Sequence, residues 1–165
     1  MIILVIDPGY AIVGYGVIEK KQNGMIQVID YGVITTPKEN TMPVRLNTIY
    51  DSVCVLIDKY HPDCMALEEL FFQNNKTTAI NVAQARGVTL LAGYKKIGKL
   101  YEYTPLQIKQ ALTGFGRAEK KQMQFMVKSI LGLNEIPKPD DAADALAAAI
   151  THAQTNQFLG NNDIK

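Results

Sequence analysis

The 165-residue sequence lacks several features that would place it in a common class. It has no apolar stretch long enough to cross a membrane, and Asp7 interrupts the apolar N-terminus too early for a signal peptide. Its two cysteines, Cys54 and Cys64, do not have metal-binding spacing, and we interpret them as reduced, buried thiols. We therefore expect a cytoplasmic protein with no membrane association.

An excess of charge of one sign is also missing. The net charge of +1 at pH 7 does not by itself indicate a nucleic-acid-binding protein. Cationic side chains are nevertheless concentrated between residues 95 and 128, where the segment carries +6 and leaves −5 for the rest of the chain. This asymmetry indicates either a face for a polyanion or a solvated helical surface.

The hydrophobic pattern predicts an α/β fold with five strands and helices between and after them. Strands are predicted over 2–6, 14–20, 26–35, 64–68 and 100–104, and helices over 41–60, 79–94, from 105, over 119–131 and over 140–154. A meander of three strands followed by alternating helices and strands predicts a mixed five-stranded sheet with helices on both faces. We find no repeat or linker, so we predict one domain over residues 1–155 and a polar, frayed tail over 156–165.

Four carboxylates lie at the ends of these predicted elements. Asp7 and Glu68 each end an apolar strand, while Asp141 and Asp144 are three residues apart at the start of the last helix and share one of its faces. Each acid alone has an ordinary explanation as a turn, strand-end or helix N-terminal residue. If the elements converge, however, the acids raise one another's proton affinity unless a cation lies among them. Carboxylate oxygens suit Mg²⁺ or Mn²⁺, so the combination predicts a divalent-metal site.

Several short motifs follow one another along the chain. They are Val5-Ile6-Asp7-Pro8-Gly9, Gly14-Tyr15-Gly16-Val17-Ile18, Ala66-Leu67-Glu68-Glu69-Leu70-Phe71, Gln84-Ala85-Arg86-Gly87-Val88, Lys109-Gln110, Ala118-Glu119-Lys120 and Asp141-Ala142-Ala143-Asp144-Ala145-Leu146-Ala147. Together they closely resemble the RuvC family of Holliday-junction endonucleases, in collinear order from about residue 2 to residue 153. The resemblance implies an RNase H-like nuclease fold, a homodimer, four-way junction DNA as substrate and the branch-migration complex of RuvA and RuvB as partners.

The resemblance also implies a catalytic, metal-binding tetrad. Its members would be Asp7, Glu68, Asp141 and Asp144, with Mg²⁺ or Mn²⁺ as cofactor and two ions in each active site. We expect Asp7 to bridge the two ions because a strand-end carboxylate is held most rigidly. Two ions would support phosphodiester hydrolysis to a 5′-phosphate and a 3′-hydroxyl. Neighbouring acids at Asp140 and Glu69 leave some ambiguity in the assignment.

Basic and aromatic residues are the candidates for contacts with DNA. Lys109 and Lys120 match family motifs, Arg117 and Lys121 are weaker candidates, and all four have exposed, solubilising side chains as their ordinary explanation. Phe71 begins a pair of phenylalanines directly after the Glu68 strand. We predict that its ring wedges against an unstacked base at the junction centre, with packing of both rings in the core as the alternative.

The helix over 79–94 is apolar on nearly every side and therefore needs cover on two sides. By family position, a twofold mate would supply the second cover, and the alternative is a helix sandwiched within the monomer. Both histidines, His61 and His152, are predicted to lie at the surface.

Other enzyme classes fit less well. An actin-like sugar kinase needs a second glycine-rich phosphate loop, and a dinucleotide-binding protein needs a third glycine after Gly14 and Gly16; neither is found. A junction-binding scaffold without catalysis would have lost a carboxylate, and none is missing. An RNase H-like nuclease that acts on RNA stays open.

Overall fold

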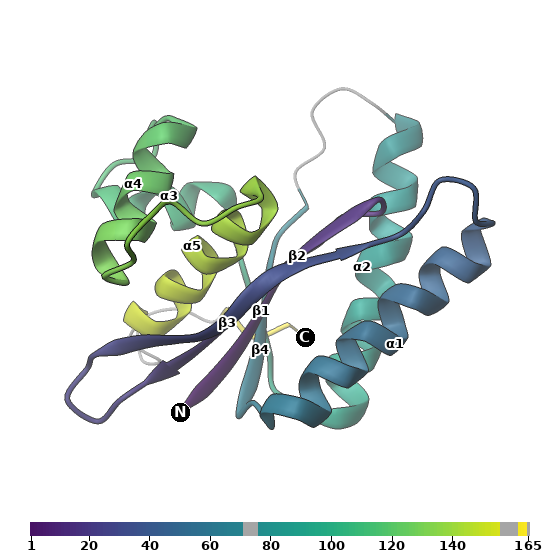
Figure 1. Ribbon diagram of the computed structural model, residues 1–165, viewed down its shortest axis with the longest axis horizontal. Helices are drawn as coiled ribbons and strands as arrows, with labels where there is room; N and C mark the ends of the chain where they lie inside the picture. The colour runs from purple at the N-terminus through teal and green to yellow at the C-terminus, as the bar shows by residue number, and fades with distance from the viewer. Residues whose placement is uncertain (71–75, 156–161, 165) are drawn as a thin grey trace.

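The computed structural model describes residues 1–70, 76–155 and 162–164. Five strands form one mixed sheet in the order β3-β2-β1-β4-β5 (Figure 1). The strands are β1 (Ile2–Asp7), β2 (Ile12–Lys20), β3 (Ile26–Thr35), β4 (Cys64–Glu68) and β5 (Leu100–Tyr103). The first three pair antiparallel, whereas β4 runs parallel to both β1 and β5. The prediction of a mixed five-stranded sheet is confirmed.

Helices cover both faces of this sheet, as predicted (Figure 1). One face carries α1 (Met42–Tyr60) and α2 (Lys76–Lys96), and the other carries α3 (Pro105–Thr113), α4 (Lys120–Ile130) and α5 (Asp140–Gln154). Strands β1 and β4 lie between the two helical layers, which explains why they are continuous apolar runs rather than alternating ones.

Alternation along β1 and β4 assigns each side chain to one of the two layers. Ile3, Val5, Cys64 and Ala66 belong to the core under α5, and Leu4, Ile6, Met65 and Leu67 belong to the core under α1 and α2. Because side chains alternate with a period of two, the residues that end the α5-facing rows are Asp7 and Glu68. This places both acids on the face of the sheet that α5 covers.

The alanine-rich helix α5 lies unusually close to β2. A Cβ atom on Gly14 would lie 2.1 Å from the carbonyl oxygen of Asp141, and one on Gly16 would lie 3.0 Å from a methyl carbon of Leu146. The small side chains of α5, including Ala142 and Ala143, are buried against the sheet. Two glycines on the strand and alanines on the helix therefore permit an approach that larger residues would prevent.

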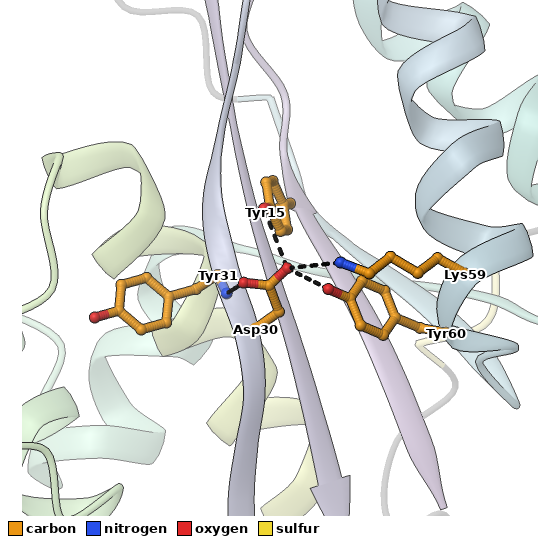
Figure 2. Close-up of polar contacts among 5 residues, drawn as sticks. All are labelled: Tyr15, Asp30, Tyr31, Lys59 and Tyr60. Atoms are coloured by element: carbon orange, nitrogen blue, oxygen red, sulfur yellow. Dashed lines mark hydrogen bonds and ion pairs between the residues drawn. The ribbon is translucent and has the colours of Figure 1, made fainter.

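A polar cluster on β3 fastens the end of α1 to the sheet (Figure 2). The Asp30 carboxylate accepts hydrogen bonds from the Tyr60 hydroxyl at the end of α1 and, at 3.4 Å, from the Tyr15 hydroxyl on β2. It also forms an ion pair with Lys59 at 3.8 Å. Helix α1 ends immediately afterwards at His61, which is exposed as predicted and adopts the left-handed conformation.

Two sequence-based expectations were wrong. His152 does not lie at the surface: it is buried between the Cys64 thiol, 3.2 Å from Nε2, and the Tyr103 hydroxyl, 2.8 Å from Nδ1. Burial lowers the pKa of its imidazole to about 4.

Residues Asn162–Ile164 are not frayed either, because the Glu102 amide donates to the Asn162 carbonyl and the Ile164 amide donates to the Leu100 carbonyl. No helix in the described ranges is long and apolar enough to span a membrane.

Candidate active site

Asp7 and Glu68 are brought together by the parallel pairing of β1 with β4. The register pairs Val5 with Ala66 and Ile6 with Leu67, so its next step places Asp7 beside Glu68. Both acids stand at the carboxyl ends of central strands, where ligand sites form in α/β sheets. The sequence predicted that each acid ends an apolar strand, and the pairing of the two strands brings the acids together.

Asp141 and Asp144 reach the same place through the close approach of α5 to β2. Gly14 pairs with Asp7 across β1 and β2, and the backbone of Asp141 lies directly against Gly14. The N-terminus of α5 is therefore held next to the end of β1. Asp144 follows one turn later and lines a cavity of about 280 Å³ together with Asp7, Glu68 and Glu69.

The pKa values show that the four acids share one electrostatic environment. Burial raises the pKa of Asp7 to about 8, and the negative charges of Glu68, Asp144 and Asp141 contribute to the rise. Burial, followed by the charge of Asp144, raises the pKa of Glu68 to about 7. Burial also raises the pKa of Asp144. Asp7, Glu68 and Asp144 therefore resist simultaneous ionisation at neutral pH.

This donor set fits a divalent cation, because four buried or half-buried carboxylates need more positive charge than their surroundings supply. Lys120 is the cation that lowers the pKa of Asp7, and its Nζ lies 3.2 Å from Asp144 and 3.1 Å from Asp140. In the described part of the chain, no three acidic, histidine or cysteine side chains lie close enough together to chelate one ion in this conformation. Three of the four predicted acids, Asp7, Glu68 and Asp144, thus line one cavity, and Asp141 lies close enough for its charge to raise the pKa of Asp7. Lys120 pairs with one member of the predicted tetrad, Asp144.

The basic residues predicted to contact DNA fall into two groups. Lys109 on α3 and Lys120 line a second cavity of about 310 Å³, which Glu68 and Asp144 also line. Arg117 is exposed in the loop between α3 and α4. Lys121 is exposed on α4 and lines a different, apolar cavity with Phe115, Phe125 and neighbouring residues. Only Lys109 and Lys120 therefore lie beside the acids.

One predicted residue lies outside the described residues, and one residue beside the acids was not predicted. Phe71, the predicted wedge, lies outside the described residues, so that prediction stays untested. Sequence reasoning missed Pro105, which lines both cavities beside the acids. Its position at the first turn of α3, directly after β5, is the only sequence signal that could have indicated this role.

Comparison with known proteins adds independent evidence. The family model for "Crossover junction endodeoxyribonuclease RuvC" matches residues 3–152. The protein of that name from Halothermothrix orenii is 57% identical over 155 residues, which cover 94% of this chain and 93% of that protein. The protein from Alkaliphilus oremlandii is 53% identical over 165 residues and the whole length of both chains.

Similar solved structures also come from RuvC proteins. Thermus thermophilus RuvC is 36% identical, with a TM-score of 0.86 and 93% of each chain covered. The structure of T. thermophilus RuvC in complex with Holliday junction substrate gives 37% identity and a TM-score of 0.87, again over 93% of each chain. The RNase H-like fold that the resemblance implied is therefore confirmed. The chain belongs to the RuvC family of crossover junction endodeoxyribonucleases.

Proposed function

We propose that the protein is a structure-specific endonuclease that resolves four-way DNA junctions by paired, symmetric nicks in recombination and repair. The observation that supports this most directly is the cavity at the carboxyl edge of the sheet, where Asp7, Glu68 and Asp144 meet. Family membership makes four-way junction DNA the substrate to test first. Residues 1–155 would form the single catalytic domain, acting in the cytoplasm.

Membership of this nuclease family implies dependence on a divalent metal, and the chain offers a suitable donor set. We assign Asp7, Glu68, Asp141 and Asp144 as the metal-binding and catalytic tetrad, with two Mg²⁺ ions, or Mn²⁺ in their place. When bound, such ions activate water for in-line attack and stabilise the departing 3′-oxygen. The chain's own part is to hold Asp7 and Glu68 rigidly at strand ends and to release their protons when a cation arrives.

Lys109 and Lys120 would bind the DNA backbone beside the tetrad. Both line the cavity that also contains Glu68 and Asp144, so they can neutralise phosphate charge close to the scissile bond. The Lys120 side chain is about half exposed and pairs with Asp140 and Asp144, contacts that a phosphate oxygen could replace. Arg117, Lys121 and Phe71 would extend the contact to flanking DNA. The products would be a 5′-phosphate and a 3′-hydroxyl.

Two symmetric nicks require two identical sites, which a twofold dimer supplies. The outward face of α2 is the surface we assign to the dimer. Ile80, Leu91 and Tyr94 are 60%, 51% and 69% exposed there, and a Cβ atom on Gly87 would contact none of the described residues within 4 Å. The one charged residue between Ile80 and Tyr94, Arg86, pairs with Glu102 on β5. The branch-migration complex of RuvA and RuvB is the partner that family membership suggests.

The decisive experiment is cleavage of a synthetic four-way junction with and without Mg²⁺. We expect metal-dependent, paired nicks by the wild-type protein and a loss of at least about 1,000-fold for Asp7→Asn, because the variant loses a ligand carboxylate but keeps its shape. Junction affinity in Ca²⁺, measured by gel shift, should stay within a few-fold. The matched control is Glu69→Gln, an exposed neighbour whose removal should change the rate only a few-fold.

The alternatives give different results in the same assay. A junction-binding scaffold would bind the junction and leave it intact in Mg²⁺. A nuclease that acts on RNA would cut an RNA–DNA hybrid in preference to the junction. Nicking by Asp7→Asn at the wild-type rate would show that the assigned tetrad is wrong.

A further inference from the structure

We propose that Arg45 on α1 is a positioning residue that holds the turn after Asp7 and thereby fixes the Asp7 carboxylate for metal binding. The proposal rests on the proposed function, because it concerns the same site. It adds a residue that none of the sequence motifs contains.

Asp7 is the last residue of β1, and residues 8–11 connect it to β2. This connection is very tight, since a Cβ atom on Gly9 would lie 1.8 Å from the carbonyl oxygen of Ile12. Among the described residues, no side-chain hydrogen bond orients the Asp7 carboxyl group. The direction of that carboxyl group therefore depends on the backbone of the strand end and of the turn.

Arg45 reaches this turn from the first part of α1 and is only 9% exposed. Its Nη2 donates to the Tyr10 carbonyl at 3.3 Å, and its guanidinium carbon lies 3.8 Å from the centre of the Tyr10 ring. Its Nε donates to the Thr36 hydroxyl at 2.9 Å, and that hydroxyl donates to the same Tyr10 carbonyl at 2.6 Å. One side chain thus joins three segments of the chain around the turn.

The backbone at the end of β3 completes this clamp. The Thr36 amide donates to the Ala11 carbonyl at 2.9 Å, so both Tyr10 and Ala11 are held from outside the turn. The clamp links α1, the end of β3 and the connection that follows Asp7. A change in the Arg45 side chain would release two contacts with Tyr10 at once, while the contacts of Thr36 with Tyr10 and Ala11 would remain.

Arg45 is a costly residue for packing alone. It forms no ion pair with a carboxylate among the described residues, and a buried guanidinium loses hydration that an apolar side chain of similar volume would not lose. The hydrogen bonds of Arg45 go to the Tyr10 carbonyl and the Thr36 hydroxyl, and none among the described residues goes to Asp7, so Arg45 acts through the backbone of the turn. The planar guanidinium group can donate a hydrogen bond to the Tyr10 carbonyl and, at the same time, stack its face on the Tyr10 ring.

The test compares Arg45→Met and Arg45→Lys with Val53→Ala, a matched control that removes buried core volume from the same helix without touching the turn. The first readout is Mn²⁺ affinity of the DNA-free protein, measured by electron paramagnetic resonance. The other readouts are melting temperature, junction affinity in Ca²⁺ and the rate of single-turnover cleavage.

We expect Arg45→Met to weaken Mn²⁺ binding and slow cleavage by roughly 10-fold or more, with junction affinity unchanged. Arg45→Lys should fall between Arg45→Met and wild type, because one ammonium cannot reproduce the fork.

Val53→Ala should lower the melting temperature and leave Mn²⁺ affinity within about two-fold of wild type, as expected of a purely structural change. If Arg45→Met and Val53→Ala show the same Mn²⁺ affinity and cleavage rate, Arg45 only stabilises the fold and the proposal is wrong. A wild-type protein that binds Mn²⁺ but cuts no junction would instead contradict the proposed function, while the Mn²⁺ comparison would still test Arg45.

Discussion

The Asp7 carboxyl group is placed where its ionised form is unfavourable. Its pKa rises from 3.8 to about 8 in the folded protein, first because of burial and then because of the neighbouring acids. Between these two pH values the folded state binds a proton that the unfolded state releases. The free energy of unfolding therefore falls as the pH rises from about 4 to about 8. This loss of stability is greatest near pH 8, where the Asp7 carboxyl group becomes ionised and able to bind a cation.

Asp7→Asn should consequently stabilise the metal-free protein at pH 8, because a neutral amide occupies the same volume without the charge. We expect its melting temperature to exceed the wild-type value by about 4–8 °C at pH 8, equivalent to about 2 kcal/mol, and by almost nothing at pH 4. Calorimetry in EDTA at both pH values measures this. A larger difference at pH 4 than at pH 8 would show that the sign of the Asp7 contribution is wrong.

At the scale of elements, the position of α5 on β2 decides whether the acids meet. The helix contributes Asp141 and Asp144, the strand contributes only the absence of side chains at Gly14 and Gly16, and β1 contributes Asp7. A methyl group at Gly14 would collide with helix backbone, which cannot turn aside. A methyl group at Gly16 would meet the end of the Leu146 side chain, which can move.

Gly14→Ala should therefore displace the start of α5 and reduce cleavage by at least about 100-fold, since small misplacements of reacting groups have large effects on rate. It should also destabilise the protein by about 1–3 kcal/mol, as overpacking usually does. Gly16→Ala is the matched control on the same strand, and we expect it to keep cleavage within about 10-fold of wild type. Junction nicking and chemical denaturation measure the two effects. Equal loss of cleavage in both variants would mean that the contact with Asp141 has no special role.

At the scale of the whole molecule, the described residues cover α2 on one side only. Ala85, Thr89 and Ala92 are buried against the rest of the monomer, whereas Leu91 and Tyr94 face outward. The alternative of a helix sandwiched within the monomer is therefore wrong. An exposed apolar face of this kind is typical of an interface between subunits.

Leu91→Glu should separate the proposed dimer, because it places a charge in the middle of that face. Sedimentation should give twice the 18.3 kDa chain mass for the wild-type protein and 18.3 kDa for the variant at the same concentration. Val55→Glu is the control, since Val55 is an exposed apolar residue on α1. It should sediment like the wild type. A wild-type protein that sediments only as 18.3 kDa particles would refute the dimer.

The order, type and approximate ends of nearly all elements could be predicted from the sequence, because two-sided burial, amphipathic periods and turn residues are local signals. The meeting of Asp7 with Glu68 was also accessible, since it needs only the strand ends and a parallel register. Predicted ends were least accurate for α2, which begins at Lys76 rather than at residue 79.

Features that depend on contacts between distant segments could not be predicted. His152 was expected at the surface because one helix face usually is exposed, but α5 is buried from Ala145 to Ala153. The pairing of Asn162–Ile164 with β5 and the contacts of Arg45 leave no periodic signal in the sequence. Each becomes evident only when the segments are brought together in space.

The burial of α5 has a consequence for the whole proposed catalytic centre. The helix holds two acids of the proposed tetrad, Asp141 and Asp144, in its first turns and the His152 imidazole in its last turn. The distance along the helix between these acids and His152 is roughly 12–17 Å at about 1.5 Å per residue. Because α5 is closely packed along its length, a shift at one end of the helix is transmitted to the other end. We therefore expect the hydrogen bonds of His152 with Cys64 and Tyr103 to limit how far α5 can slide or tilt on the sheet, and thereby to help fix the spacing between the acids on the helix and those on the sheet.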